Sequence, residues 1–232
     1  MLSGLLIGAF AIVGISLLFV LARRDHRAAI SERASLLDGL SASLELVQRR
    51  LGADGFPAIT GRLADRRDVT VELIADTIVT RRLPQLWLVV PVREQCAHGA
   101  PSFGALARPT GAEFYSRIGG LDHRVTSPAT SDAPLMIRAD HALDERASET
   151  LCKAVDAVFR DRRIKEILVT PRGARIVCQA AEGDRGAHLI LRQVRFATSP
   201  IGANTLARAV ADADALRAAL DPVPVPQQRL TA

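Results

Sequence analysis

The first 22 residues contain no charged side chain, and this feature constrains the fold more than any other. From Leu2 to Ala22 the sequence also lacks Pro, Asn and Gln and is rich in Leu, Ile, Val and Phe. A helix rises about 1.5 Å per residue, so a helix of this length would span roughly 30 Å, the thickness of the hydrocarbon core of a bilayer. Because backbone polar groups cannot stay unpaired in lipid, we expect one transmembrane helix over residues 1–22.

A cleaved signal peptide is the alternative interpretation of this stretch. It would need a basic segment before a shorter apolar stretch and a small-x-small cleavage site. No basic side chain precedes Leu2, and the weak site at 20–22 is followed directly by Arg23 and Arg24. We therefore predict a retained anchor.

The arginines that follow the apolar stretch predict its orientation. Arg23, Arg24 and Arg27 lie just after it, and no basic side chain lies before it. Because Lys and Arg beside a span stay on the cytoplasmic side, these three residues orient the helix with its N-terminus outside. The remaining residues, 23–232, would then lie in the cytoplasm, tethered to the inner membrane.

The basic balance of the chain does not indicate nucleic-acid binding. The net charge is +5, and all basic residues except Lys153 and Lys165 are Arg. Binding of single-stranded nucleic acid would favour basic residues interleaved with aromatic residues, yet the chain has one Trp and one Tyr. Attraction to an anionic lipid surface is the alternative that the arginine doublets leave open.

Residues 23–52 are predicted to form a juxtamembrane amphipathic helix that continues the anchor. Apolar residues recur every seven positions from Ile30 to Leu51, and Gly52 suits a helix C-terminus. The apolar stripe could pack on the chain's own domain or on a second copy, and both interpretations stay open. Two glycines at GxxxG spacing permit close helix approach. The candidate helix–helix interface comprises Gly4, Gly8, Leu37, Leu40, Leu44, Val47 and Leu51.

Residues 56–94 are predicted to be a β-rich subdomain. Apolar residues alternate with polar ones on both sides of a polar turn at 65–68, which indicates a β-hairpin. The apolar run 86–92 predicts a buried strand, and Pro84 and Pro91 place it towards an edge or a bend. Residues 95–134, rich in Gly and Pro, form an irregular connecting region and offer the best place for a functional loop.

Residues 135–220 are predicted to form an α+β subdomain. Strands are expected at 135–137, 164–170, 174–179 and 188–196. One helix would follow a cap at Asp140, and another would start at Ser199-Pro200. A Pro-rich tail, 221–232, would end the chain. The predicted fold class is α+β: a transmembrane helix continuing into a juxtamembrane helix, then a small mixed region with antiparallel hairpins.

No catalytic, cofactor-binding or metal-binding set emerges from the sequence. It contains no Walker loop, GxGxxG, GxSxG or HExxH motif. Cys96 and His98 are the closest Cys/His pair, and two ligands do not make a zinc site. Cys152 and Cys178 fall among apolar residues and are interpreted as small core residues.

Three functional hypotheses follow. The leading one is a non-catalytic accessory or scaffolding subunit of the inner membrane, whose partners are the bilayer, another protein or a second copy of itself, with no nucleic acid and no cofactor. The second is a membrane-tethered enzyme. Its site would lie in 95–134, around His98, Glu113, Tyr115, Asp122 and His123. The third is a sensor of anionic lipid surface that uses the arginine doublets.

Overall fold

An antiparallel sheet organises the part of the chain that the computed structural model describes, which is residues 2–77, 82–94, 101–126, 134–191, 193–197 and 199–219. The side chains of residues 2–7, 9, 11 and 191 lie outside this description. Nine described strands pair in the order β1-β2-β3-β4-β9-β8-β5-β7-β6. Their bounds are β1 (Glu45–Leu51), β2 (Pro57–Arg62), β3 (Asp68–Asp76), β4 (Gln85–Arg93), β5 (Phe103–Ala107), β6 (His123–Val125), β7 (Leu135–Ala139), β8 (Ile164–Thr170) and β9 (Gly173–Glu182). The α+β class with antiparallel hairpins is confirmed.

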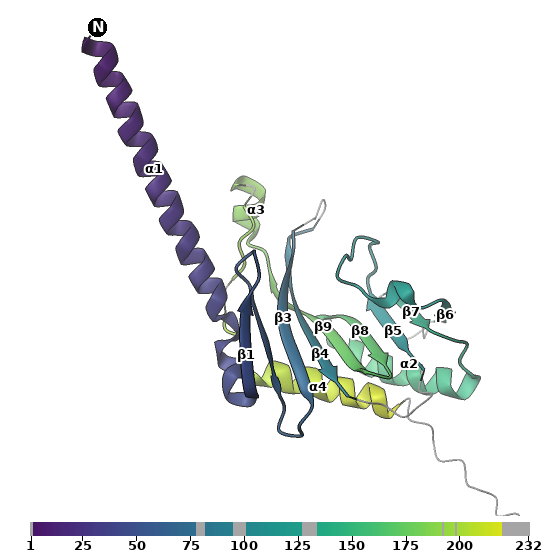
Figure 1. The fold of residues 1–232 in the computed structure, drawn as a ribbon. Coiled ribbons are helices and arrows are strands. Elements are labelled where there is room, and N and C mark those ends of the chain that lie inside the picture. The colour runs from purple at the N-terminus through teal and green to yellow at the C-terminus, as the bar shows by residue number, and fades with distance from the viewer. Residues whose placement is uncertain are drawn as a thin grey trace, which may run out of the picture.

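Two of the α-helices and the first 3-10 helix cover one face of this sheet (Figure 1). The α-helices are α1 (Leu2–Ala34), α2 (Glu145–Phe159), α3 (Arg185–Leu191) and α4 (Ala203–Ala218), with 3-10 helices η1 (Ser35–Ser43) and η2 (Ile118–Gly120). Alternate strand residues such as Leu88, Val90 and Ile176 pack against α2, α4 and η1. The residues between them, such as Trp87, Val89 and Val177, point to the opposite side, which we call the open face.

Helix α1 projects away from the sheet (Figure 1). Among the residues that the structure describes, no helix has both the length and the apolar character needed to cross a membrane.

The helix predicted over 23–52 is wrong after Ala34. The α-helix ends there, η1 follows, and Leu44 adopts an extended conformation that leads into β1. The physical reason is tertiary packing: η1 inserts Leu37 and Leu40 into the core, both with 0% exposure, while β1 gains backbone partners along β2. A seven-residue apolar repeat of three heptads is too short to outweigh these contacts.

The hairpin predicted within 56–94 is confirmed, but the edge position of the third strand is wrong. Strands β2 and β3 pair antiparallel across the polar turn. Strand β4 lies inside the sheet between β3 and β9. In its pairing with β3, Val92 lies opposite Val69, and the next paired residue, Val89, lies opposite Glu72. Pro91, which has no N–H to donate, falls between these two pairs.

The region predicted to be an irregular connection, 95–134, contributes strands to the sheet. β5 lies between β8 and β7, and its Phe103 and Ala105 are fully buried. β6 forms the sheet edge beyond β7. Short strands bounded by Gly and Pro give almost no periodic signal, which explains why the sequence pattern did not indicate them.

Strands β7, β8 and β9 confirm three of the strands predicted in the last third of the chain. The strand predicted over 188–196 is wrong, because Asp184 caps the short helix α3 at that place. The cap of helix α2 is Asp144 and not, as predicted, Asp140. The Asp140 carboxylate accepts from the Ser102 amide at 2.8 Å instead. Helix α4 starts after Gly202 and not at Ser199-Pro200. The predicted tail lies outside the described residues.

Candidate functional site

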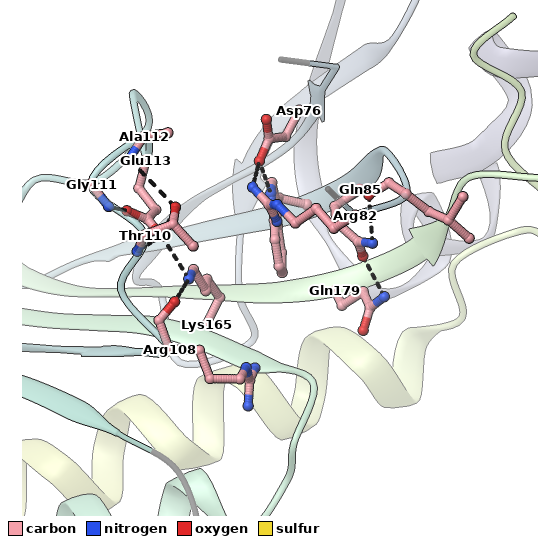
Figure 2. A network of polar contacts seen from close by, with 12 residues as sticks. Asp76, Arg82, Gln85, Arg108, Thr110, Gly111, Ala112, Glu113, Lys165 and Gln179 are labelled. Carbon is pink, nitrogen blue, oxygen red and sulfur yellow. Dashed lines mark hydrogen bonds and ion pairs between the residues drawn. The ribbon is translucent and has the colours of Figure 1, made fainter. Parts of the chain in front are cut away.

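The open face gathers the buried charged residues of the described chain. Asp76, Lys165, Glu166 and Arg175 are each 6% exposed or less. Charged side chains are rarely buried to this extent unless they are paired. We therefore take this cluster, together with the segment 108–121 that packs on it, as the candidate site. Figure 2 shows the part of it around Asp76, Glu113 and Lys165.

A β-bulge brings two consecutive charged residues onto the open face. Between Ile164 and Glu166 the β8–β9 register slips, so Lys165 is an extra residue in the ladder. Strict alternation would send Lys165 and Glu166 to opposite faces. The bulge instead lets Lys165 reach Glu113 and lets Glu166 reach Arg175.

Lys165 fastens the segment 108–121 to the sheet. Its Nζ donates to Glu113 Oε1 at 2.9 Å and to the carbonyl oxygens of Ala107 and Arg108, each at 2.8 Å. The Glu113 carboxylate also accepts from the backbone and hydroxyl of Thr110 and from the Gly111 amide (Figure 2). Donors on three sides therefore surround this carboxylate.

These contacts set the pKa values of the pair. Burial alone would raise the pKa of Glu113, but hydrogen bonds from Lys165 and Thr110 outweigh it and lower the pKa to about 2. Burial lowers the pKa of Lys165, and the hydrogen bond that Lys165 donates to Glu113 opposes this effect. At neutral pH Glu113 is ionised and fully engaged, so it is a poor general base.

Asp76 forms a second polar centre at the end of β3. Its Oδ2 accepts from Arg82 Nη2 at 2.5 Å and from the indole of Trp87 at 3.4 Å, while Oδ1 has no hydrogen-bond partner among the described residues. The Tyr115 ring lies 5.5 Å from the Trp87 ring, and its buried hydroxyl is also without such a partner. Burial, with the Asp76 charge, raises the pKa of Tyr115.

Contacts of two further residues, Gln85 and Arg175, complete the network. Gln85 donates to Glu182 at 3.0 Å and accepts from Gln179 at 2.5 Å, which ties β4 to β9 (Figure 2). Arg175 pairs with the fully buried Glu166 and donates to the Tyr115 carbonyl oxygen at 3.0 Å. Burial lowers the pKa of Arg175, against the attraction of Glu166.

The lysine and arginines of the site bind chain segments to one another, whereas Asp76 Oδ1 and the Tyr115 hydroxyl have no hydrogen-bond partner among the described residues. Lys165 and Arg175 each donate hydrogen bonds to backbone carbonyl oxygens within residues 107–115 as well as to a carboxylate. No set of three or more His, Cys, Asp or Glu side chains in the described ranges is placed to hold a metal ion. The contacts of Lys165 and Arg175 favour a structural role for these two side chains.

The enzyme hypothesis named five residues, and the structure brings two of them together. Glu113 and Tyr115 both lie in the segment that covers the open face. Asp122 and His123 are exposed at the β6 edge. His98 lies outside the described residues, as does Cys96.

The residues of the candidate helix–helix interface separate into two groups. Leu37, Leu40 and Leu44 are buried in the chain's own core, so this part of the apolar stripe packs on the chain's own domain. Val47 and Leu51 are 38% and 52% exposed on β1. In α1, Gly8 has open space around it, and the surroundings of Gly4 are outside the described side chains.

The three arginines predicted to orient a membrane span, Arg23, Arg24 and Arg27, are exposed on α1. The Arg23 guanidinium lies 4.9 Å from the centre of the Phe19 ring, one turn earlier. Sequence reasoning missed Asp76, Lys165 and Arg175 as buried residues. A usable signal existed, because Lys165-Glu166 interrupts the apolar run 164–169.

The fold and the site together define an α+β protein with a helix-backed antiparallel sheet and a projecting N-terminal helix. The chain matches no family model, no curated protein and no solved structure.

Proposed function

We propose that this protein is a membrane-anchored accessory or scaffolding subunit whose α+β domain presents an interaction surface in the cytoplasm. The observation that carries the proposal is the exposure of α1. From Phe10 to Leu21 its large apolar side chains are between 45% and 78% exposed. An apolar surface of this kind on a water-soluble chain needs a covering, and residues 2–22 carry no charge to oppose a bilayer.

Charge supports the proposed orientation. Arg23, Arg24 and Arg27 follow the apolar stretch directly, and basic residues beside a span favour the cytoplasmic side. The placement of the Arg23 side chain over Phe19 is the arrangement expected of a residue at the edge of a bilayer, where a long side chain covers apolar surface and keeps its charged end in the headgroups.

The network of basic side chains on the open face supports a non-catalytic role. Its lysine and arginines are bound to carboxylates and carbonyl oxygens, and Asp122 and His123 do not reach it. The enzyme hypothesis therefore has less support than a binding module. A second copy of the chain remains a predicted partner through the GxxxG spacing of Gly4 and Gly8 alone.

Membrane association and orientation are tested on the full chain with a reporter fused after Ala232. We expect the chain to stay in the membrane fraction after an alkaline carbonate wash and the reporter to be active only in the cytoplasm. A chain lacking residues 2–22 is the control and should be released. Extraction of the intact chain by carbonate, or an external reporter, would contradict the proposal.

The accessory role is tested by isolating the intact chain in mild detergent after crosslinking in the membrane. We expect a second protein in constant ratio to this chain. Recovery of this chain alone, at every crosslinker concentration, would overturn the role of an accessory subunit. Crosslinked dimers of the chain would instead identify the second copy as the partner.

A further inference from the structure

Helix α3 carries an apolar tip that the fold leaves uncovered. Leu189 is 55% exposed, and Ile190, at 80%, is the most exposed large apolar side chain among the described residues. Ala187 on the same helix is buried, so α3 faces the domain with one side and presents the tip on the other. Exposed apolar groups of this size, placed together, mark a surface that contacts something.

Hydrogen bonds fix the base of α3, so the exposure of its tip is a property of the folded domain. Asp184 accepts from the Ala187 amide at 2.6 Å, and its own amide donates to the Arg195 carbonyl oxygen at 2.7 Å. An isolated antiparallel bridge joins Gly183 to Phe196. The Phe196 ring then contacts that of Phe56, with centroids 6.1 Å apart. Segment 183–196 is thus closed at its base.

The position of α3 matches that of the proposed membrane anchor. Residues 193–196 line a groove together with residues 25–33 of α1. Figure 1 shows α3 standing out from the end of the sheet on the side towards which α1 extends. The apolar stretch of α1 ends at Ala22, shortly before the residues of α1 that line this groove. The tip of α3 therefore lies on the side of the domain that an anchored chain would turn to the bilayer.

The charges around this end complement an anionic lipid surface. Arg185 and Arg195, which lie at the base of α3, are both exposed, as are the three arginines 23, 24 and 27 on α1. The exposed acidic groups in residues 23–33 and in the described part of 183–196 are Asp25, Glu32 and Asp184. Basic residues near an anionic leaflet contribute about 1 kcal/mol each, and an apolar tip inserts at the boundary of headgroups and acyl chains.

We propose that α3 is a second membrane contact, in which Leu189 and Ile190 insert at the headgroup–acyl boundary of an anionic bilayer while Arg185 and Arg195 bind lipid phosphates. This inference rests on the proposed anchoring by α1. Two contacts fix the tilt and rotation of the domain on the membrane, whereas α1 alone would leave it free to swivel. The open face and the β1 edge would then be presented at a defined height.

The test uses the full chain, freed of native cysteines, in nanodiscs that contain anionic lipid. An environment-sensitive fluorophore is attached in turn at Val13→Cys, Ile190→Cys and Ala64→Cys. The last is an exposed residue in the β2–β3 turn and serves as the matched control. Quenching by lipids carrying spin labels at shallow or deep positions reports the depth of each site. The buried Trp87 reports whether each variant is folded, through its emission.

We expect the label at Ile190→Cys to be blue-shifted and quenched most by the shallow lipid, since interfacial helices lie roughly 5–10 Å into the boundary. The label at Val13→Cys should be quenched by the deep lipid, and that at Ala64→Cys by neither. Quenching of the label at 13 without quenching of the label at 190 overturns the contact of α3 with the bilayer and is still consistent with anchoring by α1. Absence of quenching at 13 overturns the anchor. A blue shift at 190 without lipid quenching would show that the tip is covered by this chain or a second copy of it, and would overturn the lipid assignment.

Hydrogen exchange of the unsubstituted chain provides a test that needs no variant. We expect slower exchange in 185–191 in anionic nanodiscs than in zwitterionic nanodiscs, and equal exchange in the turn 63–67. Equal exchange of 185–191 in both lipids, with the chain still anchored, would contradict binding of α3 to an anionic surface.

Discussion

Lys165 Nζ lies 2.9 Å from Glu113 Oε1, and both side chains are only 3% exposed. The two residues come from distant parts of the sequence, and their contact fastens the segment over the open face to a bulge in β8. A buried pair gains most when each group has additional hydrogen bonds, and this pair has them on both sides. The pair therefore gives the most direct test of how the open face is stabilised.

Replacing one partner of this pair should destabilise the fold more than replacing both. In Lys165→Met the buried Glu113 carboxylate loses its cation, at a cost of about 3–5 kcal/mol in the free energy of unfolding. In the double variant with Glu113→Gln we expect a smaller loss, because no charge is left buried. Chemical denaturation followed by Trp87 emission measures each value. Additive effects of the two single changes would show that the residues do not interact.

Acid should weaken the fold through Glu113. Its pKa in the folded chain is about 2, below the ordinary value of 4.5, so the carboxylate binds protons more readily in the unfolded chain. The stability that this group contributes is complete above pH 4.5 and is lost as the pH falls towards 2. We expect Glu113→Gln to remove part of this decline, on the order of 1–3 kcal/mol.

The control for acid stability is Glu149→Gln. Glu149 pairs with Lys153 on the exposed side of α2, with side chains 66% and 74% exposed. Such surface pairs contribute little. If Glu149→Gln flattened the acid decline as much as Glu113→Gln does, the decline would not come from the buried pair.

Local alternation in the sequence was enough to predict the hairpins but not the sheet. Val69, Val71 and Leu73 alternate with polar residues, and β3 forms there because one face is buried. The order of the nine strands depends on contacts between distant segments. Strand β5, which lies between β8 and β7, has no periodic signal of its own.

The candidate site was less predictable for two reasons. A bulge at Lys165 changes which face each following side chain reaches, and a bulge leaves no reliable mark in a sequence. Glu113 was named as a site residue, but its partner lies 52 positions away. In the same way, Leu37 and Leu40 suit a helical seam equally well whether they face a second helix or the domain's own core.

The turn between β8 and β9 should not tolerate a side chain at Gly173. Its φ is +132°, and an added Cβ would lie 2.1 Å from the Val92 carbonyl oxygen. We expect Gly173→Ala to lower the free energy of unfolding by more than about 2 kcal/mol, because strain and a clash with backbone combine. Gly119→Ala, where nothing lies within 4 Å, is the matched control. Equal melting temperatures of the two variants would contradict this prediction.

Leu40 should act as a core residue, in contrast with Leu51 of the same apolar repeat. Leu40 is 0% exposed and Leu51 is 52% exposed. We expect Leu40→Ala to cost about 2–5 kcal/mol and Leu51→Ala to stay within about 0.5 kcal/mol. Chemical denaturation distinguishes them. Loss of self-association in Leu40→Ala without loss of stability would restore the helical seam that the structure excludes.

The thiol of Cys178 should be inert in the folded chain. It is 8% exposed on β9, beneath α4, and burial raises its pKa to about 12. Because the thiolate is the reactive form, we expect a disulfide reagent at pH 8 to modify the half-buried Cys152 first and Cys178 only after unfolding. Cys96→Ser leaves these two thiols to be counted by mass. In urea both should react at similar rates, because the difference arises from burial alone. Modification of both at equal rates in the native chain would show that β9 and α4 separate readily, and that the core beneath them is not closed.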